Sequence, residues 1–268
     1  MIHSTAVVDA LAKLHPSVRV GPHAVIDAGV VMGPDCVVGP NVYLTGETQI
    51  GAGNVFHAGC VIGDAPQDLK YQGAPTRLII GDHNVFREHV TVSRATTLEG
   101  ATTVGSHNFI MAGAHVGHNC TVGNHVIIAN CSSLGGHAVV QDRAFISACC
   151  LVHQFSRVGT LALMQGGSAI SKDLPPFTVA AMGRNRTCGL NVVGLRRAGY
   201  SAEQRLELKK LYHCLFRSGM NVTGAAAAAR KDFTSPAAVE MLDFIAAAKR
   251  GVCAAVRTAR GHEEEMEA

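Results

Sequence analysis

Three of the fourteen histidines fall close together in Ala112–Ile128, "AGAHVGHNCTVGNHVII". His115, His118 and His125 stand there among glycines, asparagines and single aliphatic residues. An imidazole can take a proton from a hydroxyl near neutral pH, or it can bind a metal ion. Which chemistry is open to these side chains depends on the element that carries them.

A repeat of six residues carries these histidines. Every sixth residue from Ile2 to Ile170 is large and apolar, except Asp68 and Ala74. This period matches neither the 3.6 residues of a helical turn nor the alternation of a strand, so each hexad must combine a short extended piece with a turn. Glycine often follows the apolar residue, where a backbone without Cβ is favourable. The pattern predicts a parallel β-solenoid; three hexads would close one coil, with about 4.8 Å between coils.

Such a solenoid brings distant histidines together. His137 follows His118 by 19 residues, which is one coil plus one residue, and His153 follows 16 residues later. A lone histidine at a turn is more often a surface or packing residue. Three of them on one wall, beside a polar loop, favour a functional site.

Polar residues interrupt the hexads near residues 63–79, "GDAPQDLKYQGAPTRLI". Asp68 and Lys70 stand where the core needs aliphatic residues, so this segment must leave the coil as a loop. Ser93–Thr103 is a second irregular stretch. A solvated pair is the simplest interpretation of Asp68 and Lys70, but loops on rigid scaffolds often carry binding residues.

The pattern becomes helical from Asn191. "SAEQRLELKKLYHCLFRSG" opens on Ser201 as an N-cap and closes on Gly219, and the segment from Ser235 repeats this start and stop. We predict a β-solenoid over residues 1–190 and a C-terminal helical domain over 191–268, with a disordered acidic tail, "HEEEMEA".

The composition bears on compartment and partners. No apolar run approaches the roughly 18 residues that span a bilayer, and the N-terminus lacks a signal-peptide pattern, so a cytoplasmic protein without an integral membrane segment is expected. Nine scattered cysteines without a CxxC pair argue against a disulfide framework or a zinc ribbon.

Residues 191–261 hold twelve Lys or Arg and five Asp or Glu, net +7, which fits either a solvated surface or an acidic partner. Nucleic acid is not expected, because interleaved aromatic residues are missing.

The hexads resemble those of the left-handed β-helix acyltransferases. Local strings narrow the resemblance to the UDP-N-acetylglucosamine O-acyltransferases of lipid A biosynthesis: "QDLKY" from Gln67, "AHVGHNCTVGN" from Ala114, "VHQF" from Val152, "DLPPF" from Asp173 and "GLNVVGLRRAGY" from Gly189. The resemblance covers nearly the whole chain. It implies a left-handed parallel β-helix with a C-terminal α-helical domain, and a homotrimer with sites in the clefts between neighbours. It also implies transfer of an (R)-3-hydroxyacyl group from acyl carrier protein to the 3-hydroxyl of UDP-N-acetylglucosamine, without cofactor or metal.

The resemblance also implies residue roles. His118 would be the general base that takes the hydroxyl proton, and the Gly136 N–H would stabilise the developing oxyanion. Asn119 stands where the family often has an aspartate that orients the base, and an amide oxygen can still accept the imidazole N–H. Substrate contacts are implied for Gln67, Asp68, Lys70, His115, His137, His153, Gln154, Gly166, Asn191 and Arg197.

Further departures concern specificity. Val193 replaces an acidic residue that is frequent in the family, and Ala198 replaces a basic one, which bears on nucleotide recognition. The floor of the acyl channel is expected near Met164, Gln165 and Gly166. Members that select short chains carry a bulky residue at the position of Gly166, so a longer acyl donor is expected here.

Other functions fit parts of the pattern. A γ-type carbonic anhydrase also uses a trimeric left-handed β-helix, with three histidines on zinc. Its motif pairs two ligands five residues apart, whereas the nearest histidines here are three (His115 to His118) and seven (His118 to His125) apart. A solenoid that only binds a partner, the N-acyltransferase of the same pathway and a 3-amino-sugar acceptor are the remaining alternatives.

Overall fold

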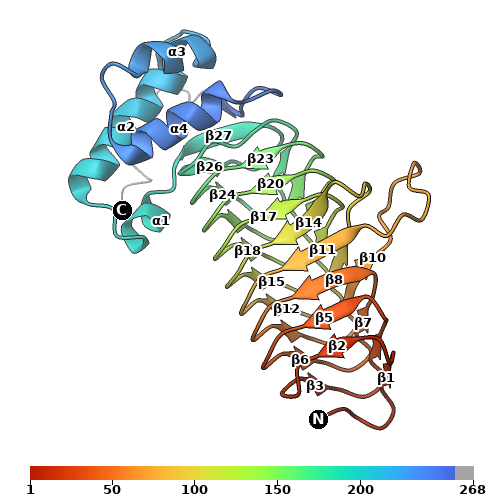
Figure 1. Ribbon diagram of the computed structural model, residues 1–268. Coiled ribbons are helices and arrows are strands. Elements are labelled where there is room, and N and C mark those ends of the chain that lie inside the picture. Colours follow the sequence, from red (N-terminus) through yellow and green to blue (C-terminus); the bar gives the residue numbers. More distant parts are fainter. Residues whose placement is uncertain (257–268) are drawn as a thin grey trace.

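The computed structural model describes residues 1–256 of the chain. Short parallel strands stack there into three sheets that form the walls of a β-helix (Figure 1). Sheet 1 contains β1 (Val7–Val8), β4 (Val25–Ile26), β7 (Tyr43–Leu44), β10 (Val61–Asp64), β13 (Thr91–Ser93), β16 (His115–Val116), β19 (Ser133–Leu134), β22 (Leu151–Val152) and β25 (Ala169–Ile170).

The other two walls follow the same order along the chain. Sheet 2 contains β2 (Lys13–Leu14), β5 (Val30–Met32), β8 (Glu47–Ile50), β11 (Arg77–Ile80), β14 (Ala101–Val104), β17 (Thr121–Val122), β20 (Val139–Val140) and β23 (Arg157–Val158). Sheet 3 contains β3 (Arg19–Val20), β6 (Val37–Val38), β9 (Val55–Phe56), β12 (Val85–Phe86), β15 (Phe109–Ile110), β18 (Ile127–Ile128), β21 (Phe145–Ile146) and β24 (Leu163–Met164). The turns from sheet 1 to 2, from 2 to 3 and from 3 to 1 are called corners 1, 2 and 3 below.

The pairing register confirms three hexads per coil. Val7 pairs with Val25, 18 residues later. Val61 pairs with Thr91, 30 residues later, and Thr91 with His115, 24 later, so the two loops add twelve and six residues to their coils. Both additions are multiples of six. The apolar residues therefore stay in phase across each loop.

Both loops leave the β-helix at corner 1, on consecutive coils. The first occupies residues 65–76, between β10 and β11, and the second occupies 94–100, between β13 and β14. The predicted limits of the first loop, 63–79, are too wide, because Leu78 already points into the core. Leu98 fits the hexad phase but lies in the second loop, 55% exposed, so its assignment to the apolar repeat is wrong.

A narrow apolar core runs along the axis of the coils. Phe56 and Phe86 stack at 4.9 Å between ring centroids, and each is almost completely buried. The side-chain oxygen of Asn54 accepts from the Asn84 side chain at 2.9 Å, and that of Asn84 accepts from the Asn108 backbone N–H at 2.9 Å. These ladders satisfy polar groups that repeat from coil to coil, which a buried amide requires.

The chain leaves the solenoid through a small sheet extension. β26 (Thr178–Ala180) adds to sheet 3 beside β24, β27 (Arg186–Leu190) pairs antiparallel to β26, and β28 (Ala254–Ala255) pairs parallel to β27. Between β27 and β28 lie four helices: α1 (Val192–Arg197), α2 (Ala202–Arg217), α3 (Val222–Ala229) and α4 (Pro236–Ala246). Figure 1 shows α2, α3 and α4 gathered at the end of the solenoid.

The helix starts follow from their caps. Ser201 caps α2 and forms a reciprocal box with Gln204, and Ser235 caps α4 ahead of Pro236, so both predicted N-caps are confirmed. Each such cap is worth about 1 kcal/mol. Helix α3 was not predicted, although its Asn221 cap and alanine run are helix signals. The division into domains at residue 190 stays a prediction, and the predicted disordered tail lies outside the described residues.

Candidate active site

A pocket of about 370 Å³ lies at corner 1, next to the second loop. It brings together six of the predicted site residues: Gln67, His115, His118, Gly136, His153 and Gln154. Ser93, Gly117, Ser133, Leu134 and Gly135 complete its lining. The residues come from four consecutive coils and the first loop, so stacking of the coils, and not proximity in the sequence, builds the pocket.

Gly136 fixes the place of His118. The two residues are 18 apart and hold the same corner position on neighbouring coils, with Gln154 in that position on the next coil. A Cβ on Gly136 would lie 2.4 Å from both Cε1 and Nε2 of His118. No side chain fits there, and the glycine therefore lets the imidazole lie directly against the Gly136 backbone.

Asn119 and the second loop set the orientation of the His118 ring. Nδ1 of His118 lies 3.0 Å from the Asn119 side-chain oxygen, which also accepts from the Thr96 backbone N–H at 3.1 Å and the Thr96 hydroxyl at 2.9 Å. A backbone N–H can only donate, so the amide oxygen, and not the nitrogen, faces Thr96 and His118. His118 Nδ1 must then carry the proton, which leaves the lone pair on Nε2, beside Gly136.

Two further histidines near His118 favour the neutral form. Burial lowers the pKa of His115, with a smaller contribution from His118, and the Thr91 hydroxyl lies 2.8 Å from its Nδ1. Burial also lowers the pKa of His137, again with repulsion from His118, while Asp68 acts in the opposite direction. The His137 ring meets that of His118 edge-on at 5.4 Å and stacks on Phe155 at 4.6 Å. Neutral rings can act as hydrogen-bond partners without adding positive charge to the pocket.

Other predicted residues lie outside the pocket. Lys70 is exposed on the first loop, where its backbone N–H donates to Asp68 at 3.0 Å. Gly166 lies exposed at corner 3, and a Cβ there would meet only the Ala148 carbonyl, at 3.6 Å. Met164 is completely buried in the solenoid core. The floor of an acyl channel near Met164, Gln165 and Gly166 stays a prediction.

Asn191 has a structural role in this chain. Its side-chain oxygen accepts from Gly194 N at 2.9 Å and caps α1, and its Nδ2 donates to the Leu161 carbonyl at corner 2, also at 2.9 Å. It is 9% exposed. Arg197 is exposed at the end of α1. Nucleotide contacts by these residues stay predictions. The predicted residues are thus spread over all three corners of the solenoid.

Sequence reasoning missed the residues that hold the loops. Arg94 donates to the Tyr71 hydroxyl at 2.9 Å and to the Gly63 carbonyl at 2.9 Å, which ties the first loop to the next coil. Thr96, which fixes Asn119, was also missed. The sequence carries no signal for either contact, because a loop outside the repeat has no periodicity to place its side chains.

Within residues 1–256 there is no cluster of three or more His, Cys, Asp or Glu side chains placed to hold a metal ion. In the same part of the chain, no helix is long and apolar enough to cross a membrane. All nine cysteines are free thiols.

Comparison with known proteins gives the same family at three levels. Residues 173–253 match the family model "Udp N-acetylglucosamine O-acyltransferase; Domain 2", and residues 29–64 and 101–136 match the model of six bacterial transferase hexapeptides. An acyl-[acyl-carrier-protein]–UDP-N-acetylglucosamine O-acyltransferase of Syntrophobacter fumaroxidans is 43% identical over 254 residues, covering 94% of this chain and 98% of the relative. The one of Herminiimonas arsenicoxydans is 41% identical, with the same coverage. The chain belongs to the UDP-N-acetylglucosamine O-acyltransferase family.

Solved structures of the family agree with this fold. The UDP-N-acetylglucosamine acyltransferase of Francisella novicida superposes with a TM-score of 0.90 at 33% identity, covering 96% of this chain and 95% of that one. The acyltransferase of Bacteroides fragilis gives 0.90 at 38%, covering 94% and 99%. The predicted fold class, a left-handed parallel β-helix followed by helices, is confirmed, as is membership of this acyltransferase family.

The orientation of His118 yields the first prediction. His118→Ala should lower kcat by roughly 10²-fold or more, the scale expected for losing a general base, because the imidazole that lies against Gly136 is removed. Steady-state kinetics would measure this. His15→Ala, which removes an exposed histidine from the first coils, is the matched control and should leave kcat unchanged. Near-normal turnover of the His118 variant would remove this residue from the role.

Proposed function

We propose that this chain transfers an (R)-3-hydroxyacyl group from acyl carrier protein to the 3-hydroxyl of UDP-N-acetylglucosamine. The supporting observation is the His118 ring, whose Nδ1 faces the Asn119 oxygen so that Nε2 can act as a base beside Gly136. The curated relatives are named acyl-[acyl-carrier-protein]–UDP-N-acetylglucosamine O-acyltransferases, which supports transfer of an acyl group from the carrier to an oxygen of the sugar nucleotide. The nine free thiols suit a reducing compartment, and we place the reaction in the cytoplasm.

The chemistry needs three events at this corner. His118 Nε2 takes the proton of the sugar hydroxyl as its oxygen bonds to the thioester carbon. The carbonyl oxygen then gains negative charge, and the Gly136 N–H, which donates no hydrogen bond within residues 1–256, can stabilise it. As the carbon–sulfur bond breaks, the imidazolium returns the proton to the leaving thiolate. Ester and free thiol result, and the base is restored.

We further propose that the complete site lies between neighbouring chains of a homotrimer. His118 and Gly166 stand at corners 1 and 3 of one solenoid, and Asn191 is hydrogen-bonded to Leu161 at corner 2, so one chain does not gather them. A threefold arrangement of solenoids can place corner 1 of one chain against another corner of its neighbour. In this arrangement Arg197 of one chain would approach the nucleotide bound at His118 of the next.

We propose that the basic helical part captures the carrier. Arg196 lies on α1, and Lys209 and Lys210 are exposed on α2. Acyl carrier protein is acidic, and complementary charge accelerates such brief encounters. Electrostatic capture also explains why net positive charge is confined to residues beyond 190, while the solenoid is neutral.

A direct assay tests the reaction. Purified protein is incubated with acyl carrier thioesters and either UDP-N-acetylglucosamine or its 3-amino analogue, and products are identified by mass spectrometry. We expect an ester with the hydroxyl acceptor. Amide formation alone would show that the acceptor atom is nitrogen, and no acyl transfer to either sugar would overturn the proposal.

Hybrid trimers test the shared site. His118→Ala and Arg197→Ala chains should each be inactive, but equal mixtures refolded together should recover up to about a quarter of wild-type activity. In random trimers, that is the fraction of clefts that contain both native residues. If hybrids form by native mass spectrometry and stay inactive, His118 and Arg197 do not act in one shared cleft.

Gly166 tests the control of acyl-chain length. Each buried methylene is worth about 0.8 kcal/mol, so room for four more could favour a long donor by about 3 kcal/mol, on the order of 10²-fold. Because a Cβ at Gly166 meets little, Gly166→Met should fold normally and shift the preference to shorter chains. The measurement is kcat/KM over donors of increasing length. An unchanged length profile would mean that Gly166 does not close the channel.

A further inference from the structure

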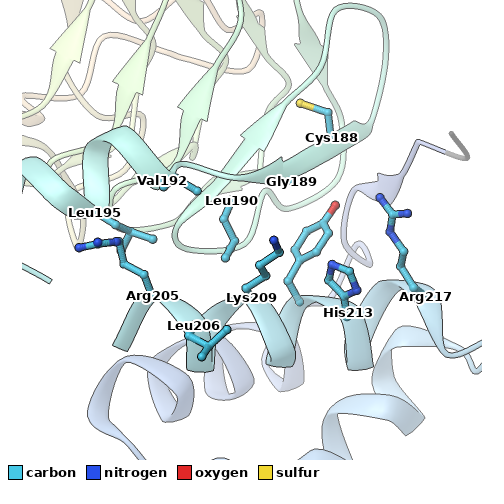
Figure 2. A pocket seen from close by; sticks show the side chains of 11 residues that line it. Cys188, Gly189, Leu190, Val192, Leu195, Arg205, Leu206, Lys209, His213 and Arg217 are labelled. Atoms are coloured by element: carbon cyan, nitrogen blue, oxygen red, sulfur yellow. The ribbon is translucent and has the colours of Figure 1, made fainter. Parts of the chain in front are cut away.

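A groove in the helical part lies apart from the pocket at corner 1. It has a volume of about 260 Å³ and runs between α2, β27 and the start of α1. Figure 2 shows a row of basic side chains along α2 on one side of it: Arg205, Lys209, His213 and Arg217. These residues are spaced by four, so each is the neighbour of the next on one helix face. The groove therefore has a continuous edge of basic side chains.

The rest of the groove is apolar. Leu190, Val192, Leu195 and Leu206 line it, together with the ring of Tyr212. Val192 and Leu206 are 54% and 53% exposed, which is high for aliphatic residues. A basic edge beside an exposed apolar strip fits an acidic peptide that carries at least one apolar side chain.

The described part of the chain ends at this groove. Val256 donates its backbone N–H to the Thr187 carbonyl at 2.8 Å, and the next residue of β27, Cys188, already lines the groove. Helix α2, which carries the basic row, packs against both β27 and β28. The described part of the chain therefore stops, at Val256, beside the edge of the groove.

The sequence of residues 257–268 matches the groove. Four glutamates, Glu263, Glu264, Glu265 and Glu267, surround a single methionine, Met266. Glu263 is seven residues beyond Val256, a reach of about 23 Å when extended. The row from Arg217 to Arg205 spans about 18 Å. The glutamates can thus reach any part of the basic row.

We propose that the acidic segment 262–268 of this chain lies in the groove, with its glutamates along the basic row of α2 and Met266 against the apolar strip. The tether gives the segment an effective concentration in the millimolar range, well above that of a free acidic protein. A consequence, which rests on the proposed function, is that acyl carrier protein competes with this segment for α2. The segment then limits capture of the carrier at low ionic strength.

Zero-length cross-linking of the full chain tests the docking. A carbodiimide joins an amine to a carboxylate only where they touch, and peptide mapping by mass spectrometry identifies the pair. We expect amide bonds between Lys209 and glutamates of the segment. Lys210, which is also exposed but points about 100° further round the helix, is the matched control and should couple much less. Equal coupling of both lysines, or coupling of neither, overturns the proposal.

Two controls test whether this coupling is electrostatic and whether it occurs within one chain. Coupling should fall severalfold in 1 M salt, where the Debye length is about 3 Å, and should vanish when the four glutamates are changed to glutamine. Mixing isotopically labelled and unlabelled chains before assembly distinguishes coupling within a chain from coupling between chains. Links found only between labelled and unlabelled chains would contradict docking within one chain.

Kinetics test the competition separately. With the four glutamates changed to glutamine, the KM for acyl carrier protein should fall about threefold or more at low salt, with kcat unchanged, and the difference should disappear at high salt. An unchanged KM would overturn the competition. If the protein transferred no acyl group at all, the proposed function would fail, while cross-linking would still decide whether the segment docks.

Discussion

The rest of this structure depends on the hydrogen-bonded register between successive coils. Each strand is only a few residues long, and such strands are stable only because parallel neighbours above and below satisfy their backbone groups. An offset of 18 residues keeps identical positions in line from one coil to the next. Any inserted segment must return the chain to that register. The two loops at corner 1 do so, and the apolar series continues unbroken beyond them.

The register between coils also positions the residues of the candidate active site at corner 1. His118, Gly136 and Gln154 occupy one position on three coils, and the contact between His118 and Gly136 arises because adjacent coils lie so close. Residues outside the repeat then orient the base: Thr96 holds the Asn119 oxygen toward His118. An amide in place of a carboxylate still fixes the proton on Nδ1, but it offers less stabilisation of the imidazolium that forms during the reaction. Asn119 thus orients the His118 ring but places no full negative charge beside it.

A polar cluster helps to anchor the helical part to the solenoid, in addition to the hydrogen bond from Asn191 to the Leu161 carbonyl. Asp173, 2% exposed, accepts from Arg157 at 2.8 Å, and the same guanidinium donates to the Phe244 carbonyl of α4 at 2.8 Å. The Arg157 guanidinium also lies 4.1 Å from the centre of the Phe244 ring. Removing one partner from such a buried pair costs about 3–5 kcal/mol, because the other charge is left without compensation. Through this cluster, the last coil fixes where the basic helices stand relative to the solenoid.

The sequence by itself determined the period, and with it the coil, the three walls and the stacking of His118 near His137. It also determined the starts of α2 and α4, because the caps at Ser201 and Ser235 are local interactions.

Only the tertiary structure decided which residues of the loops reach the pocket. Leu98 matches the repeat yet is exposed, because an insertion of six residues leaves the phase of the pattern unchanged. Met164 belongs to the core although Gly166, two residues later, is exposed, since strand β24 ends at Met164 and the chain turns at corner 3. The tautomer of His118 depends on Thr96, 22 residues earlier, and a contact between a loop and the next coil has no local signature that the sequence could display.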